Sequence, residues 1–352
     1  MSIYNSELWI ENIDTVISKL PELCELENKT IMITGATGLI CSALVDILIR
    51  YNETHNEKID IIVAGRSEKS VQERFNIFLD SDYFSFLLYD ATDDKIVTEK
   101  KIDYIIHGAS NASPNKILKE PVETMISNFI GMKALLELAK HKNTEKVIFI
   151  STSEVYGKKD NNLPFSEDEY GHIDLLNARN SYSISKSAAE TLCVSYADEY
   201  GVDVSIIRPG HIYGPTATKT DNRVSSVWAY DVAEGKDIVM KSTGEQIRSY
   251  VHCLDCGSAI LKVLQKGENK KAYNVSNPNS IITIKEMAHI LCEAANVKLR
   301  MELPTEEEKK GFNPMSNSSL LSNSLQLLGW EGCFDAKSGF ASTVKIIKET
   351  KC

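Results

Sequence analysis

Tyr182 and Lys186, a phenol and an amine four residues apart, are the side chains of this sequence best suited by type and spacing to move a proton. They fall in a stretch whose pattern predicts a helix, and residues four apart lie on one helix face. A neighbouring ammonium favours the phenolate and so lowers the pKa of a tyrosine. We therefore expect Tyr182 to exchange a proton with a hydroxyl group while a hydride passes to a redox cofactor.

Four polar residues, Ser151, Thr152, Ser153 and Glu154, follow a short apolar run that predicts a strand. A tyrosine and a lysine at helical spacing are common by chance. Their pairing gains meaning only when a polar strand end and a glycine turn occur in the same chain. We expect Thr152 and Glu154 to join Tyr182 at a reaction site, although Glu154 could also be a purely structural carboxylate.

The glycine turn lies at residues 34–41, Thr-Gly-Ala-Thr-Gly-Leu-Ile-Cys, between a predicted strand and a predicted helix. Glycine permits the tight turn and lets backbone N–H groups approach a pyrophosphate at the positive end of the helix. Cys41 stands where such turns usually have a third glycine, so we expect a slightly displaced helix with binding retained. The residues expected to contact a dinucleotide here are Gly35, Thr37, Gly38, Leu39 and Ile40.

The second predicted strand ends in Gly65 and Arg66, without the acidic residue that usually binds the 2′-hydroxyl of an NAD ribose. An arginine at this place can pair with a 2′-phosphate and stack on adenine. Arg66 therefore favours NADP over NAD, unless it is simply a surface arginine on a loop.

The elements that position these residues alternate along the chain. Short apolar runs alternate with amphipathic stretches, which predicts a parallel sheet covered on both faces. We expect an α/β protein with a Rossmann-type doubly wound parallel sheet. The predicted strands are 30–34, 59–64, 86–89, 102–107, 147–151 and 204–208, and the predicted helices are 38–51, 67–80, 121–142 and 181–200.

Both ends of the chain depart from this alternation. Residues 1–28 predict a helical extension packed on the outside, followed by a cofactor domain over 29–208. Residues 209–352 predict mainly a smaller, mixed substrate-binding domain, from which the chain can re-enter the first domain after residue 240. Its predicted helices are 224–234, 255–265, 284–295 and 319–328, and the charged run 306–310 is expected on a solvated face.

Charge and composition limit the partners of the 352-residue chain. Its 49 acidic and 39 basic residues give a net charge of -10, which disfavours nucleic acid and anionic membranes. It has no apolar stretch of about 18 residues and no secretory pattern at its start. The eight scattered cysteines are most simply reduced thiols of a cytoplasmic protein, and we expect no metal site.

Together, the glycine turn, the polar strand end and the tyrosine–lysine pair make the chain resemble the extended short-chain dehydrogenase/reductase family. Within it, the resemblance is to the NAD-dependent epimerases and dehydratases of nucleotide sugars, and it spans residues 29–330. Segments 109–114, 152–157 and 189–193 are most similar to UDP-glucuronate decarboxylases. Nucleotide-sugar dehydratases carry an aspartate after the threonine, where this chain has Ser153. That difference argues against a dehydratase.

The resemblance implies roles for further residues. Thr152 would bind the sugar 4-oxygen, Glu154 would lie near the reacting carbons, and Arg248 would hold the diphosphate. On the substrate side we also expect Ser153 and Arg223. The further residues expected at the cofactor are Asp90, Ala91, His107, Ala109, Ser110, Asn128, Ser151, Pro209 and His211. His211 departs from the family, which often has an asparagine there.

Three functions remain open from the sequence. The first is a redox-neutral epimerase or decarboxylase, which favours retained NAD. The second is a net reductase of a nucleotide-linked keto sugar, which would exchange NADPH and would suit Arg66. The third is a cofactor-binding protein without catalysis, against which the complete set of Thr152, Tyr182 and Lys186 argues. The resemblance also implies a homodimer formed through helices 121–142 and 182–200, although the apolar faces of these helices could equally belong to the core of the domain.

Overall fold

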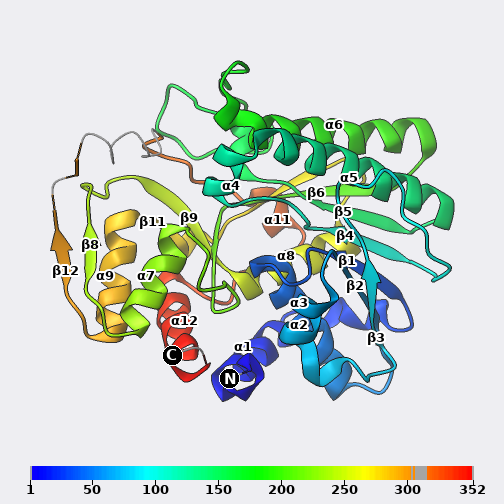
Figure 1. The fold of residues 1–352 in the computed structure, drawn as a ribbon, viewed down its shortest axis with the longest axis horizontal. Coiled ribbons are helices and arrows are strands. Elements are labelled where there is room, and N and C mark those ends of the chain that lie inside the picture. The colour runs from blue at the N-terminus through cyan, green and yellow to red at the C-terminus, as the bar shows by residue number, and fades with distance from the viewer. Residues whose placement is uncertain (1, 303, 306–314, 351–352) are drawn as a thin grey trace.

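A seven-stranded, wholly parallel sheet forms the centre of the computed structural model, which describes residues 2–302, 304–305 and 315–350. Its order, β10-β6-β5-β4-β1-β2-β3, reverses direction between β1 and β4 (Figure 1). Its strands are β1 (Thr30–Thr34), β2 (Asp60–Gly65), β3 (Phe84–Leu88), β4 (Tyr104–His107), β5 (Lys146–Ile150), β6 (Val204–Pro209) and β10 (Ala272–Val275). The Rossmann-type parallel sheet expected from the sequence is thus confirmed.

Helices cover both faces of this sheet because its side chains alternate between two cores. Ile31 and Ile33 of β1 belong to a core with α2 (Leu39–Thr54), α3 (Glu68–Phe75) and α8 (Cys253–Lys266). Met32, between them, faces the other core with α5 (Pro121–Lys142) and α6 (Ser181–Tyr200). The short α4 (Pro114–Lys119) precedes α5. The bounds of α5 and α6 agree with the predicted helices.

The smaller part of the molecule packs short strands against three helices around a third core. Its two sheets have the orders β11-β9-β7 and β12-β8. Its strands are β7 (His211–Tyr213), β8 (Ile238–Met240), β9 (Ile247–His252), β11 (Ile281–Thr283) and β12 (Leu299–Met301). Its helices are α7 (Val224–Ala233), α9 (Ile284–Ala295) and α12 (Ala336–Thr350), the last of which the sequence did not predict. This part is mixed in strand direction, as expected.

The predicted helix over 319–328 is wrong in its first turn, since α11 spans only Asn323–Leu327. Upstream of it the backbone is extended and bonded elsewhere. Leu320 donates its N–H to the Ser249 hydroxyl at 2.9 Å, and the Ser319 carbonyl accepts the N–H of Phe165. These long-range bonds outweigh local helix preference. The charged run 306–310 lies outside the described residues.

The N-terminal segment contains a helix that touches both parts of the molecule. In α1 (Glu7–Ser18), Trp9 is fully buried and donates its indole N–H to Asp46 of α2 at 3.1 Å. Tyr4 and Arg74 also bond this buried carboxylate. Toward the other part, Ser6 donates to Glu349 of α12 at 2.6 Å. No described helix is long and apolar enough to cross a membrane.

Candidate functional site

Tyr182 lies at the beginning of α6, beside the carboxyl ends of β4 and β5, and only 6% of its surface is exposed. The side chains of Thr152, after β5, and of Ser110, after β4, are polar neighbours of its phenol. Glu154, in the short 3-10 helix η4 (Ser153–Tyr156), is the carboxylate whose charge acts on Tyr182. The structure therefore brings Thr152, Glu154 and Tyr182 together, and their joint role at a reaction site stays a prediction.

The predicted electrostatic role of Lys186 needs a correction. Burial raises the pKa of Tyr182 above its ordinary value, and the charge of Glu154 adds to the rise. The Lys186 ammonium instead donates to the carbonyl of Ile150 at 2.8 Å and lies 4.6 Å from the ring centre of Phe149. Burial lowers the pKa of Lys186 to about 8. Desolvation of the phenol thus outweighs the lowering expected from helical spacing.

A chain of hydrogen bonds connects Tyr182 to the central helices. Ser110 donates its hydroxyl to the Asn128 side-chain oxygen at 2.7 Å, and Asn128 donates to the hydroxyl of Ser185 at 3.0 Å. Ser185 in turn donates to the Tyr182 carbonyl at 3.0 Å. The sequence analysis missed Ser185, although its position three residues after Tyr182 places it on nearly the same helix face.

The turn between β1 and α2 has the shape that a dinucleotide requires. Gly35 has a φ of +69°, and a Cβ there would stand 2.8 Å from the backbone nitrogen of Ala109. Gly38 caps α2 without any side-chain hydrogen bond, so no side chain competes for the N–H groups of the first turn. Thr37 precedes this cap, and Leu39 and Ile40 begin the helix. Such a helix end fits a pyrophosphate.

The side chain of Cys41, the residue in place of the third glycine, fits because Gly108 has no side chain. A Cβ on Gly108 would overlap the Sγ of Cys41. The glycine that gives the space therefore follows the neighbouring strand β4 and does not lie in the helix. The pair of a glycine after His107 and a cysteine in the turn was visible in the sequence, but only the register of β1 with β4 makes them neighbours.

His107 forms the buried floor of this turn. Its Nδ1 lies 2.7 Å from the Thr34 hydroxyl, which also accepts the N–H of Ala109 at 3.2 Å. The ring stacks on Phe149 with centroids 5.9 Å apart. Burial, with the charge of Lys186, lowers the pKa of His107 to about 3, so this histidine is neutral at physiological pH.

Arg66 and Asp90 end neighbouring strands at the outer side of the turn. Asp90 accepts the N–H and the hydroxyl of Thr92 at 2.9 and 2.8 Å, and these bonds hold its pKa below its ordinary value. The charge of Arg66, which is exposed, acts in the same direction. Gly131 of α5 lets that helix approach, because a Cβ there would lie 2.8 Å from the Ala91 carbonyl.

Arg248 and Arg223 approach His211 from the smaller part of the molecule. Arg248 is 3% exposed and donates to the carbonyls of Ile247 and Met315 at 2.8 and 3.0 Å. No carboxylate of the described residues pairs with it. Arg223 is paired with Asp221. Burial and the two arginines lower the pKa of His211 to about 3. A buried guanidinium without an acidic partner is suited to an anion.

Three predicted residues lie at strand ends. Ser151 follows β5 with a buried hydroxyl that has no partner among the described residues, and Ser153 begins η4. Pro209 ends β6 just before His211 and β7. These positions place all three at the carboxyl edge of the large sheet, where ligands bind in open α/β sheets.

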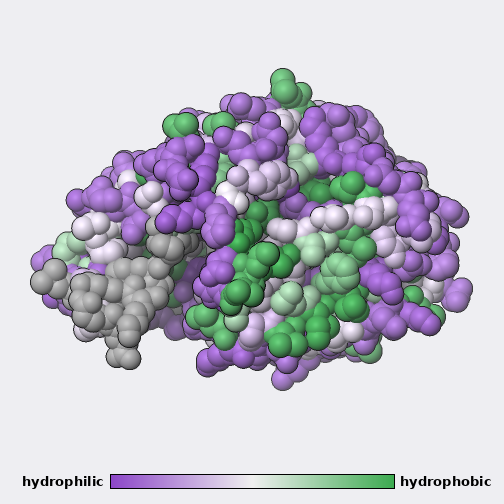
Figure 2. All heavy atoms as spheres, turned by 90° about the horizontal axis from the view of Figure 1, so that it is seen from above, coloured by the Kyte–Doolittle hydropathy of each residue, from purple (hydrophilic) through white to green (hydrophobic). Residues whose placement is uncertain are grey.

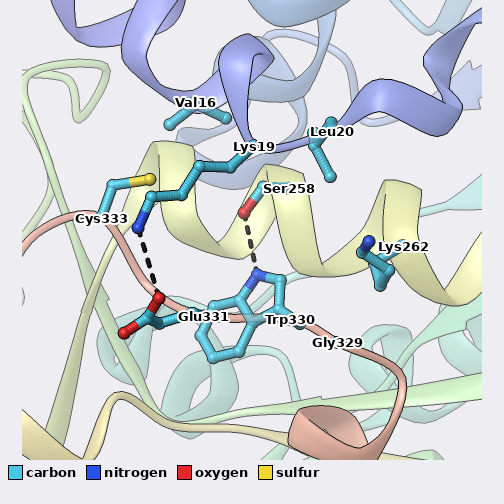
Figure 3. Close-up of a pocket in the computed structure, with 9 residues that line it drawn as sticks. All are labelled: Val16, Lys19, Leu20, Ser258, Lys262, Gly329, Trp330, Glu331 and Cys333. Atoms are coloured by element: carbon cyan, nitrogen blue, oxygen red, sulfur yellow. Dashed lines mark hydrogen bonds and ion pairs between the residues drawn. The ribbon is translucent and has the colours of Figure 1, made fainter.

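A cavity of about 240 Å³ lies elsewhere, between α1, α8 and residues 329–333 (Figure 3). Trp330 lines it and donates its indole N–H to Ser258 at 2.9 Å, and Lys19 bridges to Glu331 at 3.4 Å. The charges at its edge are therefore balanced. Across the described ranges, His, Cys, Asp and Glu side chains form no group of three or more placed to hold a metal ion.

Comparison with known proteins identifies relatives of similar size. The chain is 29% identical over 304 residues to UDP-glucuronic acid decarboxylase 3 of Arabidopsis thaliana, covering 86% of this chain and 84% of the relative. It is 26% identical over 328 residues to UDP-glucuronic acid decarboxylase 1 of Xenopus tropicalis, covering 93% and 74%. The similarity thus extends over most of both chains.

Solved structures share the fold at lower identity. A UDP-glucose 4-epimerase of Thermotoga maritima has a TM-score of 0.78 and 24% identity, covering 91% of this chain and 99% of that one. A dTDP-glucose 4,6-dehydratase of Bacillus anthracis, solved in complex with NAD, has a TM-score of 0.76 and 21% identity, covering 92% and 97%. The model of the NAD dependent epimerase/dehydratase family matches residues 31–276, and the chain belongs to that family.

Proposed function

We propose that this enzyme converts a nucleotide-diphosphate sugar without net oxidation, as an epimerase or decarboxylase that retains NAD. UDP-glucuronate is the first substrate to test, because the curated relatives are UDP-glucuronic acid decarboxylases. The observation that carries the proposal is the buried pair of Tyr182 and Thr152 beside the glycine turn, with the exposed carboxylate of Glu154 acting on the phenol. Ser153, in place of the dehydratase aspartate, supports this reading over a dehydratase.

Each residue of the site would have a separate role in the reaction. Bound NAD would take a hydride from the sugar and return it. Tyr182 would accept the proton of the sugar hydroxyl and later give it back, while Thr152 would hold the same oxygen. Because burial raises the pKa of Tyr182, its side chain is a neutral phenol at rest. It accepts a proton only as a phenolate, and nearby positive charge is needed to favour that form. Arg248, which pairs with no carboxylate of the described residues, would hold the diphosphate.

The first experiment measures turnover of UDP-glucuronate and UDP-glucose by wild type and Tyr182→Phe, with products identified by mass. We expect Tyr182→Phe to lose at least about 100-fold in kcat, the usual scale of acid–base catalysis, while NAD still copurifies. Unchanged turnover in Tyr182→Phe would contradict the assignment. Oxidation of added NADPH in step with product would instead favour the net reductase.

We propose NAD rather than NADP as the retained cofactor. The charge of Arg66 acts on Asp90, so this arginine already has an acidic neighbour, and its side chain is exposed. Mass analysis of nucleotides released from denatured protein tests this. We expect NAD in the wild type and in Arg66→Ala. Bound NADP that is lost in Arg66→Ala would contradict the proposal and give Arg66 the 2′-phosphate.

We also propose a homodimer formed through α5 and α6. Val122, Met125, Ile126 and Phe129 of α5 form an apolar stripe at helical spacing that is 38–61% exposed, and Leu118 of the preceding α4 is also 61% exposed. Figure 2 views the molecule from the side of α5 and α6, and apolar residues gather across the middle of that face. Ile126→Glu is expected to yield monomers by light scattering. Leu327→Glu, equally drastic at an 87% exposed site off the stripe, is the control.

A cytoplasmic location completes the proposal. The seven cysteines of the described residues are free thiols, which is typical of proteins in reducing compartments. Cell fractionation with an antibody to the native protein would test it. Recovery in an exported or membrane fraction would contradict it.

A further inference from the structure

Arg179 forms an ion pair with Glu154 at the open side of the tyrosine cluster. Its Nη1 donates to Glu154 Oε2 at 3.2 Å, and the two side chains are 35% and 43% exposed. Exposed ion pairs contribute little to folding stability, generally below about 1 kcal/mol. The position of this pair, rather than its contribution to stability, is therefore what sets it apart.

The two partners come from the segments that carry the reaction groups. Arg179 lies in the 3-10 helix η5 (Ala178–Asn180), immediately before α6 and three residues before Tyr182. Its backbone N–H donates to the Asn177 side chain at 3.0 Å, which fixes the turn. On the other side, the N–H of Glu154 donates to the Thr152 hydroxyl at 3.2 Å. The ion pair thus joins the Tyr182 segment to the Thr152 segment.

The charges around Tyr182 explain what the pair does. Glu154 disfavours the phenolate, whereas Arg223 of the smaller part favours it. Lys186, on the same helix, is bonded to Ile150. Glu154 is therefore the negative charge that a phenolate at Tyr182 must tolerate, and Arg179 is its described cationic partner.

We propose that Arg179 is a positioning residue that holds the Glu154 carboxylate at the site and offsets its charge beside Tyr182. This inference deepens the proposed function, because it assigns a charge-compensating partner to the same reaction site. The sequence offered Arg179 as a possible helper for phosphate or sugar, but it did not indicate the pairing with Glu154.

A spectroscopic test works without any substrate. With 3-nitrotyrosine incorporated at position 182, the absorbance of the nitrophenolate reports its ionisation in the NAD-loaded protein. We expect Arg179→Ala to raise the apparent pKa of this probe by about half a unit to one unit. In Arg179→Lys the pKa should lie close to the wild-type value. In an E154Q background the same Arg179→Ala change should shift it much less. Arg50→Ala, which breaks a surface pair with Asp14, is the control and should have no effect.

Equal shifts in the Glu154 and E154Q backgrounds, or no shift, would overturn the proposal. A kinetic test with UDP-glucuronate adds a second readout. Arg179→Ala should lower kcat about tenfold with KM within twofold, and Arg179→Lys should recover most of kcat. A rise in KM with kcat preserved would make Arg179 a substrate ligand and overturn the inference. If Tyr182→Phe keeps full activity, the proposed function fails, while the probe measurement still decides the role of Arg179.

Discussion

The two halves of the site are built by different physical means. The cofactor half, around Gly35 and Gly108, is shaped by steric contact, since backbone and thiol occupy the space that any Cβ would need. The substrate half, around Arg223 and Arg248, is shaped by charge, with donors bonded to one carboxylate and to carbonyl oxygens. Steric contacts tolerate almost no change, whereas hydrogen-bonded cations can exchange a protein acceptor for a ligand. We therefore propose that the first half fixes a cofactor and that the second adapts to a substrate.

Among the changes that test this comparison, Gly35→Ala is expected to have the largest effect. A Cβ at a φ of +69° is strained and would stand 2.8 Å from the Ala109 nitrogen. We expect at least about 100-fold weaker NAD binding, measured by calorimetry, because strain and crowding together cost roughly 3 kcal/mol. Gly201→Ala is the matched control, since Gly201 has a φ of +74° in open space. Equal losses of NAD affinity in both variants would mean that the backbone strain of a positive φ, and not crowding against Ala109, weakens binding.

Gly108→Ala tests whether crowding in the cofactor half can be relieved. The new methyl group would overlap the Cys41 thiol, so we expect a loss of about 1–3 kcal/mol in the free energy of unfolding. Adding Cys41→Gly should restore most of it, because the overlapping atom is removed. The measurement is urea unfolding of both variants. A double variant no more stable than Gly108→Ala alone would show that the thiol is not the obstacle.

Arg248→Met should separate binding from stability in the substrate half. Burial lowers the pKa of Arg248, which shows that its charge is costly to keep in place. We expect unchanged or higher thermal stability, since a buried cation without an acidic partner is replaced by an apolar chain. Affinity for UDP should fall about tenfold, or 1.4 kcal/mol. Lower stability with unchanged UDP affinity would assign Arg248 to the fold instead.

Acidification is expected to affect both halves by a smaller amount. His107 and His211 have pKa values near 3 in the folded protein against an ordinary 6.5, so only the unfolded chain takes up protons below pH 6.5. Folding stability is then lost as pH falls, by about 1.4 kcal/mol per histidine at pH 5.5. Unfolding of wild type and His211→Asn at pH 7.5 and 5.5 should show a smaller loss in the variant.

Asp255 acts in the opposite direction and explains why a variant is needed. Burial raises its pKa to about 7 against 3.8, so the folded state binds the extra proton between these values. Acidification from pH 7.5 therefore adds stability through Asp255 while it removes stability through the histidines. The dependence of wild-type stability on pH would therefore not reveal either contribution by itself. An identical pH dependence in His211→Asn and wild type would contradict the neutral state of His211.

The large sheet and the position of the glycine turn were predictable because local signals and tertiary structure agree there. The continuous apolar strands and the glycine turn each specify the same parallel unit, and α5 and α6 begin and end where the sequence indicates. The contact of Gly108 with Cys41 and the role of Ser185 escaped prediction, because they depend on strand register and on Asn128. Lys186 was placed correctly on the helix, yet its ammonium bonds to Ile150, a choice that spacing cannot reveal.

Helix α12 was missed because its sequence carries mixed signals. It contains Gly339 and a β-branched run near its end, both of which weaken a helix prediction. In the structure Phe340 stacks on Tyr213 with ring centres 3.7 Å apart, and a Cβ on Gly339 would overlap the Tyr213 hydroxyl. Packing against Tyr213 therefore stabilises this helix. The same packing requires Gly339, the residue that made the helix hard to predict.

The N-terminal extension also has a consequence for the order of folding. Ser6 bonds to Glu349, and Asn12 bonds to Ser342 at 2.6 Å, so these partners follow the extension by 343 and 330 residues in the sequence. Its contacts with Asp46 can form early, but those with α12 must wait until that helix has been synthesised. Complete docking of the extension therefore requires both parts of the molecule to be present.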